Sequence, residues 1–281
     1  MKHRKKLQTA LLYGAVLLFA TLTLAPLYWL FVMSVSDSVA LTAKPLLWWP
    51  EHLDFSRYAK LLSAAEGGVG ERFLSALENS LMVSISATAI SMAAAIPAAY
   101  SFSRYPGRQG VLYGAVALYM LPPVAFVLPL YLILSSLNML NQASSLVIVY
   151  CTILLPFSTW MLKNNFDQVP LEIEQAARID GAGLFVVISR ITLPLALPAL
   201  GATALFAYLM AWDEFFYALL YTNDIRAKTL PVAIADFAAG RATDYGLISA
   251  VGVLAALPPV VIGLLLQRTL VSGLTAGGTK G

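Results

Sequence analysis

Long apolar runs separated by shorter polar segments dominate the pattern of hydrophobic and polar positions along the chain. A helix needs about 20 apolar residues to cross the hydrocarbon core of a bilayer, where its backbone groups must be paired internally. Runs of that length lie near residues 8–33, 77–102, 110–136, 144–163, 192–217 and 246–267. The pattern therefore predicts an all-α, polytopic integral membrane protein with six transmembrane helices.

The first run follows a basic start that also resembles the beginning of a secretory signal. The apolar region of a signal spans about 7–15 residues, whereas this run continues from Leu7 to Val35. Pro26 follows the most plausible cleavage position, Ala25, and would hinder cutting there. We therefore expect an uncleaved first transmembrane helix.

The orientation of the spans follows from Lys and Arg, which are enriched in short cytoplasmic loops. The N-terminus and the 103–109 loop carry basic residues and no acid, so both are expected in the cytoplasm. Six crossings then return the C-terminus to the cytoplasm. The 34–76, 137–143 and 218–245 loops are expected outside, and the 164–191 loop inside.

Composition excludes several classes of protein. Hydrophobic residues make up 59% of the chain and charged residues 12%, against roughly 45–50% and 25% in soluble domains. Too few charges are therefore present to cover the surface of a soluble enzyme or to keep a chain disordered. The net charge of +3 is small and scattered, so no nucleic-acid partner is expected.

The sequence offers little covalent chemistry. The sequence contains no Gly-Lys pair and hence no phosphate-binding P-loop. Both histidines, His3 and His52, lie outside the expected spans, and Cys151 is the single cysteine. We therefore expect no catalytic residues, no metal site and no cofactor in this chain, which disfavours an intramembrane enzyme.

Carboxylates are scarce within the expected spans, where the sequence places Glu78, Asp213 and Glu214. Asp213 lies about 21 residues into the fifth run, or about 32 Å from its start, which is near the outer interface. An ion-coupled secondary carrier, the alternative class of transporter, would keep charges at mid-depth. The acidic pair is either part of a gate or a solvated helix end.

The 166–191 loop has a strong local pattern. Pro170 suits the first turn of a helix, and Gly181 suits the left-handed position that ends one. A second apolar helix is expected from Leu184 to Ile191, followed by Leu193-Pro194. The pattern predicts a helix–glycine–helix elbow, named here the elbow, which either binds a soluble partner or packs only on its own bundle.

The residues Ala176-Ala177, Asp180-Gly181-Ala182, Ile191, Leu193-Pro194 and Pro198 resemble, at this spacing, the "EAA" loop of ABC-importer permeases. The resemblance implies a type I ABC importer fold, in which this loop carries the coupling helix that sits in a cleft of a cytoplasmic ATPase. It assigns ATPase coupling to Glu174, Gln175, Ala176, Ala177, Asp180 and Gly181.

The chain departs from the family pattern at Gln175, where the family has glutamate. Glutamine cannot form the ion pair attributed to that position. Either the preceding Glu174 takes over the contact from a neighbouring direction, or the contact is neutral. The two residues are about 100° apart on a helix, which disfavours the first alternative.

Two further segments resemble carbohydrate permeases. Ala211-Trp212-Asp213-Glu214-Phe215 is similar to their Trp-Asn-Glu-Phe segment, with Asp213 where asparagine is usual. The tail from Val271 to Gly281 resembles that of the maltose-transporter second-permease family. The resemblance implies an outer gate or a docking site for the binding protein at Trp212, Asp213 and Glu214. It also implies that the loop near 221–245 reaches toward that protein.

The resemblance as a whole implies a permease subunit that moves a carbohydrate or similar polyol across the bacterial inner membrane by alternating access. Its implied partners are a second, different permease subunit, two ATPase subunits that hold ATP and Mg, an extracytoplasmic solute-binding protein, and membrane lipid. The expected organisation is 1–76 (N-terminal tail, first span and outer loop), 77–267 (five-helix transporter core) and 268–281 (cytoplasmic tail). The sequence does not specify the sugar.

The topology is testable with single cysteines. Lys60→Cys should react with a membrane-impermeant thiol reagent added outside the cell, because its loop is expected there. Gly107→Cys should react only after the membrane is opened. Equal labelling of both positions in intact cells would overturn the orientation.

Overall fold

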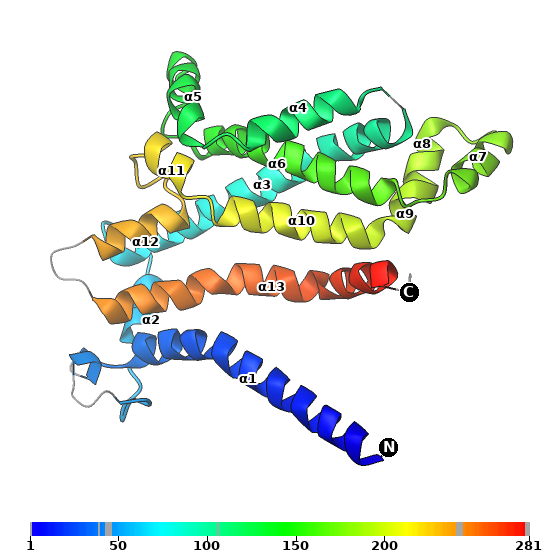
Figure 1. Cartoon of the computed structure of the whole chain (residues 1–281). Coiled ribbons are helices and arrows are strands. Elements are labelled where there is room, and N and C mark those ends of the chain that lie inside the picture. Colours follow the sequence, from blue (N-terminus) through cyan, green and yellow to red (C-terminus); the bar gives the residue numbers. More distant parts are fainter. Residues whose placement is uncertain (1, 39, 43–46, 106, 240–243, 279–281) are drawn as a thin grey trace. The chain divides into compact units, whose positions relative to one another are not determined.

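The computed structural model describes residues 2–38, 40–42, 47–105, 107–239 and 244–278, and every regular element in these ranges is a helix (Figure 1). The elements in chain order are α1 (Lys2–Val35), η1 (Ala40–Thr42), α2 (Ser56–Leu61), α3 (Val69–Arg104), α4 (Gln109–Tyr119), α5 (Val124–Ser136), α6 (Ala143–Phe166), α7 (Leu171–Ile179), α8 (Leu184–Val187), η2 (Ile188–Thr192), α9 (Leu193–Leu195), α10 (Leu197–Trp212), α11 (Phe216–Tyr221), α12 (Leu230–Ala238) and α13 (Tyr245–Gly278).

Four single helices within the described residues are long and apolar enough to cross a membrane: Gln8–Val35, Val69–Arg104, Ala143–Phe166 and Tyr245–Gln267. Two bent pairs complete the set to six if each counts as one span. The pair α4 and α5 bends by 99°, and the pair Leu184–Leu195 and α10 bends by 80°. The all-helical membrane fold is therefore confirmed.

The third and fifth runs are each interrupted by a bend at their prolines. Pro122 and Pro123 follow the end of α4, and Pro198 lies in the first turn of α10. Proline has no N–H to donate and its ring clashes with the preceding turn, so a straight helix cannot continue through these positions. Asp213 follows the end of the 16-residue α10.

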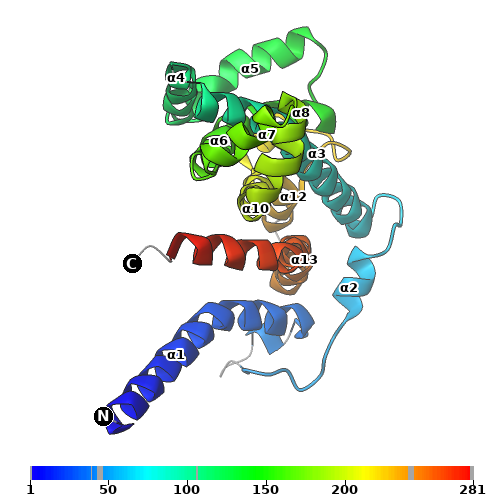
Figure 2. The same ribbon diagram turned by 90° about the vertical axis from the view of Figure 1, so that its right-hand side faces the viewer.

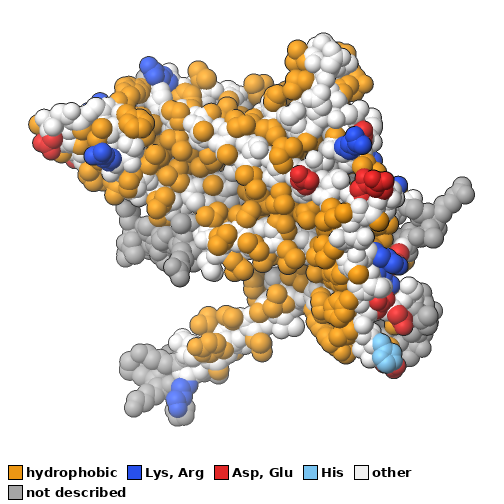
Figure 3. Space-filling model, turned by 180° about the vertical axis from the view of Figure 1, so that it is seen from behind, with side chains coloured by type: hydrophobic (Ala, Val, Ile, Leu, Met, Phe, Trp, Pro, Cys, Tyr) orange, Lys and Arg blue, Asp and Glu red, His pale blue; other side chains and the backbone are white. Residues whose placement is uncertain are grey.

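The chain packs as two compact units. The first consists of Met1–Leu74 with Ala233–Leu257, and the second of Ser75–Val232 with Pro258–Gly281. The boundaries expected after residues 76 and 267 fall inside α3 and α13, respectively. On the face in Figure 3, hydrophobic side chains cover most of the surface and charged ones are few and lie mainly toward the edges of the view, which suits a membrane-spanning chain.

In the first unit, the buried Arg57 of α2 connects this helix to the segment after α1 and to the residue before α13. Its guanidinium donates to the Ser36 carbonyl and to the Ser38 hydroxyl, and its Nε lies 3.4 Å from Asp244 Oδ1. A Cβ at Gly246 would meet this guanidinium. A larger residue at Gly246 would therefore displace the Arg57 guanidinium from these contacts.

In the second unit, α3, α4, α6 and α10 run side by side, with α7 and α8 at one end (Figure 1). Alanines at the helix contacts, including Ala87, Ala207 and Ala211, are fully or nearly fully buried beside larger residues such as Tyr150. Small residues let helix backbones approach closely in membrane proteins. A separate cluster of Ala95, Ala99, Tyr100, Leu162, Phe166 and Ala196 lies next to the elbow.

At the other end of this unit, asparagine and serine side chains hold the loop that follows α11. Asn79 donates to the carbonyls of Arg226 and Lys228 at 2.9 and 3.0 Å, and the Ser80 hydroxyl accepts from Leu230 N at 2.7 Å. Asn141, with φ of +57°, donates its backbone N–H to the Tyr221 carbonyl at 3.0 Å. The 222–230 segment is therefore fixed on α3.

Candidate functional site

The elbow has the helix–glycine–helix form that its sequence predicts. α7 begins directly after Pro170 and ends before Gly181, which has φ of +88°. The Ala182 N–H donates to the Ala177 carbonyl at 2.9 Å, and the Gly181 N–H to the Arg178 carbonyl at 3.1 Å. These two bonds form a Schellman motif, which requires a left-handed residue at Gly181. In Figure 2 the elbow faces the viewer, in front of α6 and α10.

Glu174 of α7 is the charged centre of the elbow, and its side chain is buried. Its carboxylate forms an ion pair with Arg104, the last residue of α3, at 2.8 Å between Oε1 and Nη2. Arg104 Nε also donates to both carboxylate oxygens, at 3.1 and 3.2 Å. Such a two-nitrogen contact fixes the orientation of both side chains.

Two hydroxyl groups complete the surroundings of this carboxylate. Tyr100 of α3 donates to Glu174 Oε2 and Thr192 of η2 donates to Oε1, both at 2.8 Å. Arg178 in turn donates to the Tyr100 hydroxyl at 3.2 Å. The carboxylate thus joins α7 to the end of α3 and to the turn that leads into α10.

A second layer of polar contacts supports Arg104. Its Nη2 donates to the Val169 carbonyl at 3.2 Å, and its Nη1 to the Ser103 hydroxyl at 3.0 Å. Ser103 donates to Asp167, which is paired with Lys163 at 2.7 Å. The start of the elbow is therefore bound to α3 and α6 by side chains as well as by the chain itself.

The electrostatics of Glu174 follow from these contacts. Burial by itself would raise the pKa of the carboxyl, because the charged form loses its hydration. Hydrogen bonds from Arg104, Tyr100 and Thr192 outweigh that effect and hold the pKa of Glu174 below its usual value. The group is therefore ionised at neutral pH, and the ion pair is formed.

The residues that the family resemblance assigns to ATPase coupling divide into two sets. Gln175, Ala176, Asp180 and Gly181 are exposed and Ala177 is half-buried, whereas Glu174 is buried at 1% exposure. The Glu174 carboxylate faces the interior of its own unit, and its assignment to ATPase coupling stays a prediction. This geometry also excludes Glu174 as a replacement for the missing glutamate at Gln175.

The outward surface of the elbow is apolar as well as polar. Ile179 is 86% exposed and Phe185 is 83% exposed, and Leu184 on the same elbow is half exposed. Large apolar side chains that are exposed to water are costly. An exposed apolar patch of this kind indicates a protein-binding surface.

The Trp212, Asp213 and Glu214 segment lies where α10 ends. Trp212 is buried and stacks on Tyr208, with ring centroids 5.7 Å apart. The Glu214 carboxylate accepts the N–H groups of Tyr217 and Ala218 at 2.9 and 3.2 Å, which caps α11. Asp213 is exposed. Two of the three residues therefore have a structural role, and Asp213 is the member available to a partner.

Sequence reasoning missed the partners of Glu174. In the sequence, Arg104 served only as a basic residue that indicates the side of the membrane on which the 103–109 loop lies. Tyr100 and Thr192 lie in apolar runs, which give no sign of a polar contact. The signal that could have found them is a glutamate on the inward face of α7, beside an arginine at the end of a neighbouring span. Within the described part of the chain, His, Cys, Asp and Glu form no group of three that could hold a metal.

Comparison with known proteins agrees with this architecture. Residues 91–276 match the family model of the binding-protein-dependent transport system inner membrane component. The trehalose/maltose transport system permease protein MalG of Thermococcus litoralis is 34% identical over 274 residues, with 96% of each chain covered. The diacetylchitobiose uptake system permease protein DasC of Streptomyces coelicolor is 30% identical, with 95% of each chain covered.

A solved structure supports the fold. A chain of a bacterial ABC transporter involved in the import of the acidic polysaccharide alginate superimposes with a TM-score of 0.77 at 22% identity, covering 94% of this chain and 97% of that one. Together these matches define a membrane transport component. The chain belongs to the family of binding-protein-dependent transport system inner membrane components, which confirms the predicted ABC-importer permease and gives no support to an ion-coupled carrier.

The buried ion pair yields the first structural prediction. Glu174→Gln should destabilise the attachment of the elbow by about 3–5 kcal/mol, because it leaves the Arg104 charge buried without a counterion. Trypsin cleavage at Arg178 in the purified chain measures this release. Glu172→Gln, an exposed acid on the same helix, is the matched control and should leave the cleavage rate unchanged.

The pH dependence follows from the lowered pKa of Glu174. A carboxyl whose pKa is lowered by folding stabilises the folded state above its unfolded pKa of about 4.3, and loses that contribution as the pH falls through the folded value. The elbow should therefore stay attached at neutral pH and be released below about pH 4, as measured by cleavage with pepsin, because trypsin is inactive in acid. Equal cleavage of Glu174→Gln and the parent chain at pH 7 would contradict the role of the pair.

Proposed function

We propose that this chain is the permease subunit of an ATP-driven importer for a carbohydrate or similar polyol. The printed names of similar proteins support the substrate class, since they include permeases for trehalose/maltose, for diacetylchitobiose and, in Agrobacterium fabrum, for sulfoquinovosyl glycerol. The chain itself carries out no covalent reaction in this proposal. ATP and Mg are held by two separate ATPase subunits, and a second, different permease completes the pathway.

The single observation that carries the coupling role is the construction of the elbow. It is tied inward through the buried Glu174 and presents exposed apolar residues, Ile179 and Phe185, outward. An element built in this way can receive a docked protein without being pulled away from its own bundle. We infer that the ATPase binds this outward surface, with Gln175 as a neutral contact.

The proposed mechanism is alternating access driven through that contact. Arg104 ends α3, and Thr192 lies in the turn that leads into α10, so both helices are bonded to the same carboxylate. When the ATPases close, displacement of α7 would move the ends of α3 and α10 together. The substrate would then pass between the two permeases as the opening changes sides.

The proposal places both termini and the elbow in the cytoplasm, in agreement with the basic N-terminus and 103–109 loop. The 222–230 segment and Asp213 then lie on the extracytoplasmic side. The hydrogen bonds from Asn79 to that segment support a firm surface there for the solute-binding protein. The membrane is the bacterial inner membrane, as for the family.

The coupling role is tested by changing the elbow within the assembled transporter. Gly181→Val should uncouple or release the ATPase, because a β-branched residue at φ of +88° costs roughly 1–2 kcal/mol and opens the Schellman motif. Ala177→Trp should have the same effect by overpacking the interface, at roughly 1–3 kcal/mol. Copurification of the ATPase and sugar-stimulated ATP hydrolysis measure the result.

Gly183→Val is the matched control, because Gly183 has φ of −69° and open space around it. It should keep both the ATPase and its stimulation. If Gly181→Val and Ala177→Trp also retained a full ATPase complement and normal stimulated hydrolysis, the elbow would not be the coupling element. Loss of membrane insertion in these variants would instead show that the elbow stabilises only its own bundle.

Asp213 gives a separate prediction for the opposite side of the membrane. Asp213→Asn should retain most transport, because the exposed side chain makes a neutral or shape-dependent contact in this proposal and asparagine preserves its shape. Uptake of radiolabelled sugar into proteoliposomes measures the effect. Complete loss of uptake by a normally assembled variant would show that the negative charge itself is required.

A further inference from the structure

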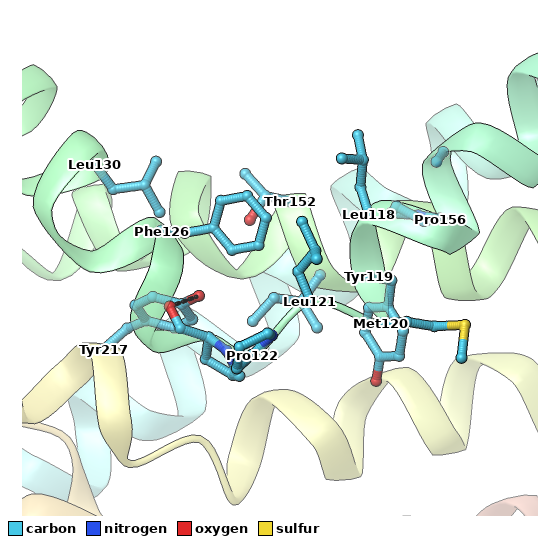
Figure 4. A pocket seen from close by; sticks show the side chains of 13 residues that line it. Leu118, Tyr119, Met120, Leu121, Pro122, Phe126, Leu130, Thr152, Pro156 and Tyr217 are labelled. Carbon is cyan, nitrogen blue, oxygen red and sulfur yellow. Dashed lines mark hydrogen bonds between the residues drawn. The ribbon is translucent and has the colours of Figure 1, made fainter.

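A cavity of about 580 Å³ opens where α4 and α5 part. Residues 120–123 separate the two helices, which bend by 99° across this break. Figure 4 shows the aromatic side chains of Tyr119, Phe126 and Tyr217 around the cavity, with the Thr152 hydroxyl of α6 behind them. None of the functional assignments above uses this cavity.

The lengths of two helices indicate that the cavity lies near the middle of the membrane. α4 has 11 residues, so the break lies about 16 Å from its start, close to half of a hydrocarbon core of about 30 Å. The wall contributed by α6 consists of Thr152, Ile153 and Pro156, which lie near the centre of that 24-residue helix. The break therefore does not lie at a membrane surface.

The backbone at the break cannot face lipid. Pro122 and Pro123 have no N–H, so the carbonyls of Leu118 and Tyr119 lose their helical donors. Leu121 N donates to the Leu118 carbonyl at 3.1 Å, whereas the Tyr119 carbonyl has no such replacement among the described backbone bonds. Met120 beside it is 81% exposed. Irregular backbone at this depth occurs only where it is buried in protein or lines water.

The chemistry of the wall selects a class of ligand. Every residue that lines the cavity is uncharged, which disfavours an ion or a charged head group. The volume is in the range of small-molecule sites, whose walls are mainly apolar and aromatic with a few polar groups. A sugar ring has apolar faces that stack on aromatic rings and hydroxyls that bond to carbonyls and to groups such as Thr152.

We propose that this cavity is a section of the carbohydrate pathway, in which a neutral sugar ring stacks on Tyr119, Phe126 and Tyr217 at mid-depth. The inference rests on the proposed import of carbohydrate and names the residues that meet the substrate. The small number of polar groups suits a pathway, because a transported molecule must bind weakly enough to leave. The Tyr217 hydroxyl already donates to the Pro123 carbonyl at 3.2 Å, so its ring is held in place.

The test uses single cysteines in the assembled transporter, reconstituted in proteoliposomes in a Cys151→Ser background. Phe126→Cys and Thr152→Cys replace residues of the wall. Leu128→Cys is the matched control, because Leu128 is 65% exposed on the same helix as Phe126 but lies outside the wall. A negatively charged thiosulfonate reagent should label the two wall positions at least about tenfold faster than the control, since thiols react as water-accessible thiolates.

Maltose and trehalose are the probes, added separately, and at least one of them should slow labelling at both wall positions and leave Leu128→Cys unchanged. Rapid labelling that neither sugar slows would overturn the assignment to sugar. Labelling of the lone chain that disappears on assembly would show that a helix of the second permease fills the cavity, which also overturns it. If the two wall cysteines reacted no faster than the control cysteine at Leu128, the cavity would not be part of a water-filled path.

Stimulation of ATP hydrolysis by the same sugars, measured on the same proteoliposomes, separates the two proposals. Stimulated hydrolysis without protection of the wall cysteines leaves carbohydrate import in place and rejects this cavity as its path. Absence of stimulation by either sugar, together with wall cysteines that neither sugar protects, rejects these sugars as substrates and the sugar assignment of the cavity with them.

Discussion

A carboxylate that is removed from water must find its charge partners nearby, and Glu174 imposes this constraint on the whole elbow. Its ion pair with Arg104 and its hydrogen bonds from Tyr100 and Thr192 draw three segments of the chain to one point. Attraction between buried charges compensates for lost hydration only when the geometry is good. The positions of α7, the end of α3 and the start of the fifth span are therefore mutually dependent.

The second constraint comes from proline within apolar runs. The bends of 99° and 80° both occur where proline removes amide donors, and each leaves irregular backbone beside other helices of the same unit. A bilayer tolerates this only where protein or water receives the exposed carbonyls. The two breaks therefore indicate surfaces that do not contact lipid. In contrast, α1 has exposed Leu, Val and Phe side chains and thus an apolar surface suited to lipid.

Local patterns in the sequence predicted the helices of the elbow well. Contacts between residues far apart in the sequence could not be predicted from such patterns. Pro170 and Gly181 act on their own turns of the chain, so the bounds of α7 could be read from them. The inward direction of Glu174 could not, because its partner Arg104 lies 70 residues earlier. Likewise Pro122 and Pro123 were visible as interruptions, but a bend of 99° depends on how α5 packs against α11. The coupling role of the elbow came from the family resemblance. That Glu174 is buried, unlike the other residues to which the resemblance assigns coupling, came from the structure.

The turn η2 determines where the chain tolerates a change in length. Its five residues, Ile188–Thr192, are wound as a π-helix, which holds one more residue per turn than the α-helices on either side. Because the π-turn holds its extra residue within about one turn, removing one residue there would restore α-helical winding with little rotation of the helix beyond it. A one-residue deletion can therefore be absorbed at η2 without turning the fifth span away from the elbow, whereas the same deletion within the α-helical turns of α10 would rotate everything beyond it by about 100°.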